Sequence, residues 1–217
     1  VHQVVSAQDR VAVYFSEHGA TKGRMAVWSG VGIYRSNGQH LTGCIAQEDY
    51  MTRQRQLKSG VCDAVEAPAV SPWDTLPLGP NPAAEAVVRH WLTQSWPQTT
   101  QSIRCDDEHI TGVPLQFKVQ TTHIDELHAS GNDVVFHARQ TGIYLDGLSG
   151  MAPNQNNAVL HCNGILKVED GQVVHGVRIA FGDGGPVPAD RLDLVLGHAQ
   201  ADVVADGQVE DAAHIAP

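Results

Sequence analysis

Residues 157–174 read NAVLHCNGILKVEDGQVV, and this stretch decides the fold because the chain carries a related stretch a second time. Residues 25–41, MAVWSGVGIYRSNGQHL, align with it after one extra residue is allowed near Glu169. The segments upstream also match, since Asp9 to Gly19 (DRVAVYFSEHG) aligns with Asn132 to Gly142 (NDVVFHARQTG). Spacing between the matched blocks differs by about ten residues, as expected when insertions fall in loops. The sequence therefore predicts one sheet-forming unit present twice.

Both copies have the pattern of antiparallel strands joined by tight turns. Val11, Val13 and Phe15 alternate with Ala12, Tyr14 and Ser16, which is the period of a β-strand. Ser36-Asn37-Gly38 predicts a hairpin turn, because Asn-Gly readily adopts the positive φ angles that such turns need. Glu169-Asp170-Gly171 predicts the corresponding turn of the second copy.

The two copies are separated by a segment that cannot form regular structure. Prolines at positions 68, 72, 77, 80 and 82 interrupt it. A helix is predicted to begin at Pro82, capped by Asn81, with one apolar face formed by Ala84, Val87, Val88, Trp91 and Leu92. Glu48 to Lys58 reads as a short polar helix or an extended arm.

These segments predict the domain organisation and the fold class. Residues 1–60 form a first unit that shows only its sheet, with its helices absent or upstream of Val1. Residues 61–82 are a Pro-rich linker, 83–185 a second unit, and 186–217 a C-terminal extension. Because a helix precedes a run of antiparallel strands, we expect an α+β fold with a helical layer on a curved sheet.

Composition excludes several classes of function. The net charge of −10 argues against a nucleic-acid partner, which would need a basic surface. No apolar run approaches the roughly 20 residues that a membrane span requires, so we expect no membrane partner. Cys44, Cys62, Cys105 and Cys162 have no metal-site spacing and read as free thiols of a cytoplasmic protein.

Several motifs resemble those of the nuclear transport factor 2-like superfamily, which includes ketosteroid isomerases and SnoaL-like polyketide cyclases. GILKVEDGQVVHGVRIAFGD (Gly164 to Asp183) resembles its closing hairpin, and AEAVVRHWL (Ala84 to Leu92) resembles its first helix. CDDEHITG (Cys105 to Gly112) resembles an acidic segment of the family. DRVAVYFSEHGATKG (Asp9 to Gly23) and GIYRSNGQHL (Gly32 to Leu41) supply similar strands in the first copy. The resemblance implies a cone-shaped α+β barrel with an apolar pocket, and sheets that pair back to back. Two copies would make a pseudo-dimer within one chain.

The resemblance also implies a catalytic pair. Strand alternation places His161 and Asn163 on one face, with Cys162 on the other. Asn163 falls where the isomerases carry the acid that stabilises an enolate, so its amide would face the pocket and donate to an oxyanion. His161 would then transfer the proton near neutral pH. The alternative is a buried histidine beside a structural asparagine.

Other residues complete the expected pocket. Trp91 aligns with the tyrosine of the isomerases, and Asp106 lies in the acidic segment, which is structural in the family. His137 and Arg139 share one strand face, which binds substrate if it is concave and forms an interface if it is convex. The first copy lacks the cyclase His–Asp pair, so Trp28 and Tyr34 are expected to pack a core or an interface.

The predicted function is that of a SnoaL-like pocket protein that acts without cofactor or metal. It would isomerise, cyclise or eliminate from a small apolar ring-bearing molecule by proton transfer. The alternative is a non-catalytic small-molecule-binding or assembly module of the same fold. In either case, a homo-oligomer of the chain is expected to form through sheet faces. Epoxide hydrolysis ranks third, because it needs an Asp–Arg–Asp set and Arg139 is the only arginine that suggests itself.

Overall fold

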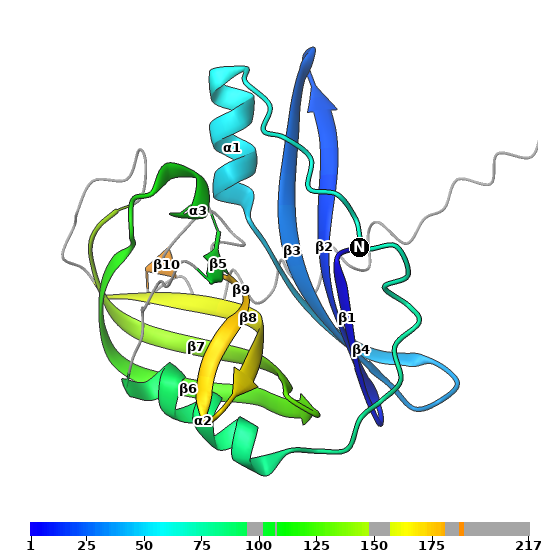
Figure 1. The fold of residues 1–217 in the computed structure, drawn as a ribbon. Coiled ribbons are helices and arrows are strands. Elements are labelled where there is room, and N and C mark those ends of the chain that lie inside the picture. The colour runs from blue at the N-terminus through cyan, green and yellow to red at the C-terminus, as the bar shows by residue number, and fades with distance from the viewer. Residues whose placement is uncertain (95–101, 107, 148–156, 181–186, 189–217) are drawn as a thin grey trace, which may run out of the picture.

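The computed structural model describes residues 1–94, 102–106, 108–147, 157–180 and 187–188, which form two antiparallel sheets (Figure 1). The N-terminal sheet has the order β1-β2-β3-β4. Its strands are β1 (Gln3–Ala7), β2 (Arg10–Thr21), β3 (Arg24–Ser36) and β4 (Leu41–Glu48).

The C-terminal sheet has the order β5-β9-β8-β7-β6, and β10 also pairs with β8. Only β5 is parallel to its neighbour, β9. Its strands are β5 (Ile103–Cys105), β6 (Gln116–Ser130), β7 (Asp133–Asp146), β8 (Asn157–Glu169), β9 (Gln172–Ile179) and β10 (Val187–Pro188). The helices are α1 (Tyr50–Ser59), α2 (Pro82–Gln94) and α3 (Glu108–Thr111). The expected α+β class is confirmed.

The two sheets share strand order and register. Val11 of β2 pairs with Tyr34 of β3, and the aligned Val134 of β7 pairs with Leu166 of β8. At the far end of the same ladders, Gly19 pairs with Ala26 and Gly142 pairs with Ala158. The alignment of the two sequence segments thus reproduces the pairing of the strands that they form.

The sheets pack against each other through aligned faces. Ala12 and Ile33 of the N-terminal sheet belong to one buried cluster with their aligned counterparts, Val135 and Ile165. The cluster also contains Val5, Tyr14, Val31, Val177 and Ile179. Because side chains alternate along a strand, the opposite face of each sheet points away from this interface.

Helix α2 covers the opposite face of the C-terminal sheet (Figure 1). Its buried residues Ala84, Val88, Trp91 and Leu92 are those of the predicted apolar stripe. Asn81 Oδ1 accepts from Ala84 N at 3.1 Å, which caps the first turn as expected. The core beneath α2 is therefore separate from the core between the sheets.

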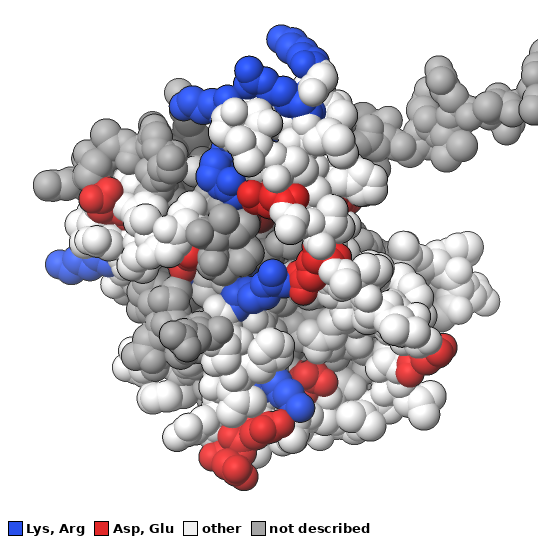
Figure 2. All heavy atoms as spheres, turned by 45° about the horizontal axis from the view of Figure 1, so that its top comes forward, with Lys and Arg blue, Asp and Glu red and all other residues white. Residues whose placement is uncertain are grey.

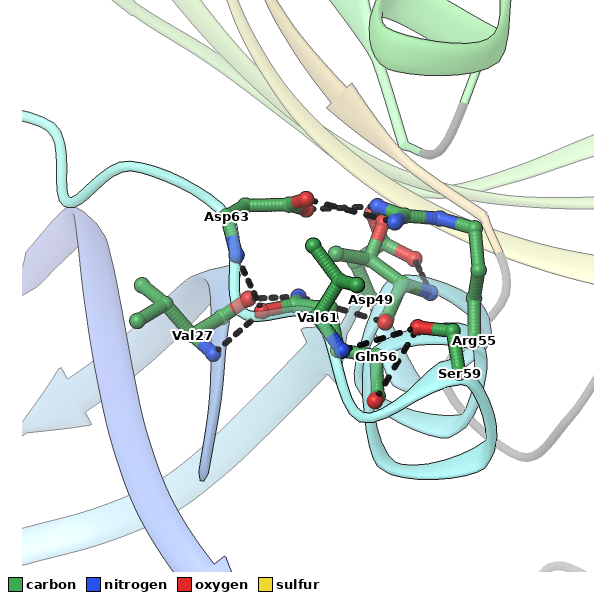
Figure 3. Close-up of polar contacts among 8 residues, drawn as sticks. Val27, Asp49, Arg55, Gln56, Ser59, Val61 and Asp63 are labelled. Atoms are coloured by element: carbon green, nitrogen blue, oxygen red, sulfur yellow. Dashed lines mark hydrogen bonds and ion pairs between the residues drawn. The ribbon is translucent and has the colours of Figure 1, made fainter. Parts of the chain in front are cut away.

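Helix α1 covers an edge of β3 that lacks a neighbouring strand. Strand β4 ends at Glu48, opposite Gly30, so Val27 has no strand partner on that side. The Gln56 side chain replaces the missing strand, since its Oε1 accepts from Val27 N at 3.0 Å and its Nε2 donates to Val27 O at 2.5 Å (Figure 3). Asp49 caps the helix by accepting from Thr52 N at 2.9 Å.

Basic side chains surround the end of α1. Arg24 Nη1 donates to Leu57 O at 2.7 Å and to Lys58 O at 2.9 Å, where a cation complements the helix dipole. Figure 2, in which this end comes forward, shows Lys and Arg side chains gathered there. Residues 61–81 contain no helix or strand. None of the helices in the described ranges has both the length and the hydropathy to cross a bilayer.

Candidate functional site

His161 and Asn163 lie on the opposite face of β8 from the one expected. Leu160 and Cys162 belong to the core beneath α2, so the alternation of the strand turns His161 and Asn163 toward the N-terminal sheet. The expectation that they point into the pocket of the second unit is therefore wrong. Sequence alternation grouped the residues correctly, but it did not indicate which face α2 covers.

Asn163 joins the two sheets. It is fully buried, and its Nδ2 donates to Val31 O at 2.8 Å and to Ile45 O at 2.9 Å. Its Oδ1 lies 2.7 Å from Nδ1 of His137, which must be the donor because the amide oxygen only accepts. Two of these contacts cross to the N-terminal sheet and the third lies within the C-terminal sheet, which matches the structural alternative for this residue.

His137, His161 and Arg139 form a cluster on the face of the C-terminal sheet opposite α2. Arg139 binds Asp125 through two hydrogen bonds, of 2.7 and 2.8 Å, and the rings of His137 and His161 stack at 5.9 Å. Burial, and then the neighbouring His137, lowers the pKa of His161 to about 4. Burial likewise lowers the pKa of His137. His137 is buried beside Asn163 on the face that meets the N-terminal sheet, whereas the partly exposed Arg139 is held by Asp125 of its own sheet.

Trp91 and Asp106, in contrast, lie inside the second unit. Trp91 is 8% exposed and packs in the core beneath α2. Asp106 is 1% exposed, and its two carboxylate oxygens lie 2.9 and 2.7 Å from Ala180 N, which donates to them. The structure thus buries four of the six expected site residues, Trp91 and Asp106 within the C-terminal unit and Asn163 and His137 on the face toward the N-terminal sheet.

An arginine lies beside this acid. Arg178 of β9 is 1% exposed, and its Nη2 lies 3.4 Å from Oε2 of Glu108. The other oxygen of Glu108 accepts from Leu115 N at 2.8 Å. We call Asp106, Glu108 and Arg178 the acid–arginine cluster.

The electrostatics of the cluster favour a permanent cation. Burial opposes the charge of Arg178, but the acidic groups around it hold its pKa above the ordinary value. Those groups are Cys105, Glu108, Asp106 and Cys162. Burial raises the pKa of Cys162 to about 12 and also raises that of Cys105, so both thiols stay protonated. The cluster offers a fixed positive charge and two carboxylates, and its thiols are poor nucleophiles.

Sequence reasoning missed Arg178 and Glu108. Arg178 stands between Val177 and Ile179, which both face the interface, so the arginine must face the core. A charge at such a position is a signal of a buried site. The sequence instead suggests Arg139 for the arginine of an Asp–Arg–Asp set, and Arg139 lies on the opposite face of the sheet.

No group of three His, Cys, Asp or Glu residues suited to a metal ion occurs in the part of the chain that the structure describes. Neither Cys105 nor Cys162 forms a disulfide.

Comparisons with known proteins find solved structures of low similarity. No family model and no curated protein matches the sequence. One similar solved structure, described as a SnoaL-like polyketide cyclase from Jannaschia sp. CCS1, has 16% identity and a TM-score of 0.33, covering 52% of this chain and 99% of that chain. Another, AclR from Streptomyces galilaeus, described as a hydroxylase, has 17% identity and a TM-score of 0.27, covering 58% of this chain and 95% of that chain. The chemistry of the site rests on its own residues.

Proposed function

We propose that residues 83–185 form a SnoaL-like enzyme that moves a proton on a small, apolar, ring-bearing molecule without a cofactor. The observation that carries this proposal is the guanidinium of Arg178, 1% exposed, in the interior beneath α2 with carboxylates beside it. A buried cation is suited to stabilising negative charge that develops on a substrate oxygen. A carboxylate within reach of the same substrate can take the proton.

Glu108 is the better base of the two acids. Both oxygens of Asp106 accept the Ala180 N–H, so this residue is positioned by the backbone. Oε2 of Glu108 makes only the 3.4 Å contact to Arg178 among the described residues. In the proposed reaction, Glu108 removes a proton from the carbon next to a carbonyl, and Arg178 stabilises the resulting enolate oxygen. Return of that proton to another carbon completes an isomerisation.

We further propose that the two sheets descend from a tandem duplication and pair as a pseudo-dimer within the chain. The support is the equal register of Val11–Tyr34 and Val134–Leu166, which are aligned positions. Aligned faces also bury each other, as the two copies of a symmetric dimer do.

Hydrogen–deuterium exchange tests the proton-transfer proposal directly. The wild-type protein should accelerate exchange of the acidic C–H bonds of a ring-bearing ketone, such as 2-tetralone, in D₂O, followed by NMR. Glu108→Gln keeps the shape of the side chain and should lower the exchange rate by about 10²–10⁴. Glu169→Gln, an exposed carboxylate on the β8–β9 hairpin, is the matched control and should leave the rate unchanged.

A non-catalytic binding module is the competing function. It is favoured by the hydrogen bonds of both acids to backbone N–H groups, which tie β5 and α3 to the rest of the unit. In that case no ketone would exchange faster than in buffer, and Glu108→Gln would change only the free energy of unfolding. Exchange that is accelerated equally by wild type and Glu108→Gln would remove Glu108 from the mechanism.

A further inference from the structure

The outward face of the N-terminal sheet carries a groove. Its position corresponds to the face of the C-terminal sheet that α2 covers. It encloses ≈ 480 Å³ and follows β2 past Val11, Val13, Phe15 and Glu17, with Trp73 of the Pro-rich segment at its side. Six residues of extended strand separate Val11 from Glu17, so the groove is roughly 20 Å long. That length and volume suit a small molecule with fused rings.

Aromatic rings lie on the floor of this groove because glycines make room for them. A Cβ added to Gly30 would lie 2.6 Å from Cζ of Phe15, and one added to Gly32 would lie 2.8 Å from Cε2 of Tyr34. The two rings thus rest directly on the sheet backbone. Flat aromatic surfaces favour a planar partner, which can stack on them.

The end of the groove at Glu17 is negative. Glu17 is exposed and forms no ion pair within the described ranges. Burial of part of its carboxyl group, and then repulsion from Glu48, raises the pKa of Glu17. Glu48 itself accepts from Trp28 Nε1 at 2.8 Å. The nearby cation, Arg53, stacks over the Trp28 ring at 5.1 Å, and its charge acts in the opposite direction on the pKa of Glu17.

The opposite end of the groove is electrically more balanced. Arg10 Nε lies 3.7 Å from Asp9 Oδ1 and 3.9 Å from Glu126 Oε2, so this cation is already compensated. A ligand charge would therefore be placed at the Glu17 end. A carboxylate without an ion pair beside electron-rich ring faces attracts a cation.

We propose that this groove binds a planar, ring-bearing cation, of the class of protonated aromatic amines. The rings of the ligand stack on Phe15 and Tyr34, and its ammonium or amidinium group faces Glu17. This site lies on the other side of the N-terminal sheet from the sheet interface, so it is independent of the acid–arginine cluster. It also gives the first unit a function, although that unit lacks the polar pair expected from family motifs.

Three probes with one ring system separate charge from stacking. At pH 7.5, 9-aminoacridine is a cation, acridine is neutral and acridine-9-carboxylate is an anion. Titration of the protein into each, followed by fluorescence anisotropy, gives their dissociation constants. We expect the cation to bind at least about tenfold more tightly than the neutral probe, and the anion to bind most weakly.

Substitutions at the groove then locate the site. Glu17→Gln should weaken the cation about fivefold and leave acridine unchanged, since only charge is removed from an exposed side chain. Glu17→Lys should reverse the order of cation and anion. Phe15→Leu should weaken all three probes. Glu169→Gln, an exposed carboxylate on the other sheet, controls for the net charge of −10 and should have no effect.

Two results would overturn the proposal. Equal affinity for the three probes would mean that Glu17 does not select charge. Equal loss of cation affinity in Glu17→Gln and Glu169→Gln would mean that the probe binds the acidic surface at large. Because Glu17 is exposed, its variants should fold, and matching thermal unfolding curves would confirm this.

Discussion

Replacement of Asn163 by Ala is expected to weaken the contact between the two sheets. The side chain is fully buried and makes three hydrogen bonds, to Val31 O, Ile45 O and His137 Nδ1. Each lost bond is worth about 1 kcal/mol, and a buried donor left on His137 adds roughly 1–2 kcal/mol. The expected cost is therefore about 4 kcal/mol, a large part of the roughly 5–15 kcal/mol that stabilises a domain.

Urea unfolding followed by circular dichroism measures this cost. Asn163→Ala should lower the midpoint strongly, and a second transition should appear if the sheets separate before each unfolds. Asn157→Ala, an exposed asparagine at the start of β8, is the control and should change the free energy of unfolding by less than about 0.5 kcal/mol. Equal losses in the two variants would refute the role of Asn163 as a bridge between the sheets.

Three further predictions concern the buried interior. Burial lowers the pKa of His128 to about 4. As the pH falls below about 6.5, the unfolded chain therefore binds a proton at this histidine before the folded chain does. The contribution of neutral His128 to the free energy of unfolding is thus present at pH 7 and is lost toward pH 4. The loss of unfolding free energy between pH 7 and pH 5 is up to about 2 kcal/mol. The urea midpoint of His128→Gln should therefore depend less on pH than that of the wild type. Gln56→Ala should lower the free energy of unfolding by about 2–3 kcal/mol, because it leaves the backbone N–H and C=O of Val27 without side-chain partners. Faster hydrogen exchange of the Val27 amide would verify the loss. Gly164→Ala places a Cβ 2.3 Å from an aromatic ring carbon and should cost about 3 kcal/mol in thermal unfolding, whereas Gly79→Ala meets no atom within 4 Å and should be neutral.

Local sequence patterns carry most of the information about the elements. Alternation from Val11 onward predicts β2, and the Asn37-Gly38 turn predicts the return from β3 to β4, because both depend on residues close in sequence. The apolar face of α2 is likewise local. The polar sequence of α1 does not distinguish a helix from an extended arm. Its position depends on the contact of Gln56 with the unpaired edge of β3 at Val27, which lies 29 residues earlier in the chain.

The candidate site depended on information that the strands do not contain. Strand β8 is buried on both faces, so no polar side distinguishes the interior from the interface. The sequence therefore predicts that Asn163 and His161 face the pocket. In the structure, Cys162 faces that side instead. The groove was missed for another reason. Phe15 and Glu17 lie in a segment, Asp9 to Gly23, that predicts only a strand. Their importance comes from Gly30 and the neighbouring carboxylate of Glu48, which only the paired strands bring close to them.

The contact between Asn163 and Val31 bears on the origin of this arrangement. These two residues occupy aligned positions in the two copies, and Asn163 Nδ2 donates to Val31 O at 2.8 Å. Two copies related by a two-fold axis bring equivalent residues together at the axis, so such a contact supports the proposed duplication. Under the proposed duplication both copies keep the interface, which constrains Val31 and Asn163 alike. The outward faces of the two sheets are under no common constraint. Helix α2 covers that face of the C-terminal sheet, whereas the same face of the N-terminal sheet carries the groove. The two units can therefore hold different sites, an acid–arginine cluster in one and an aromatic, anionic groove in the other.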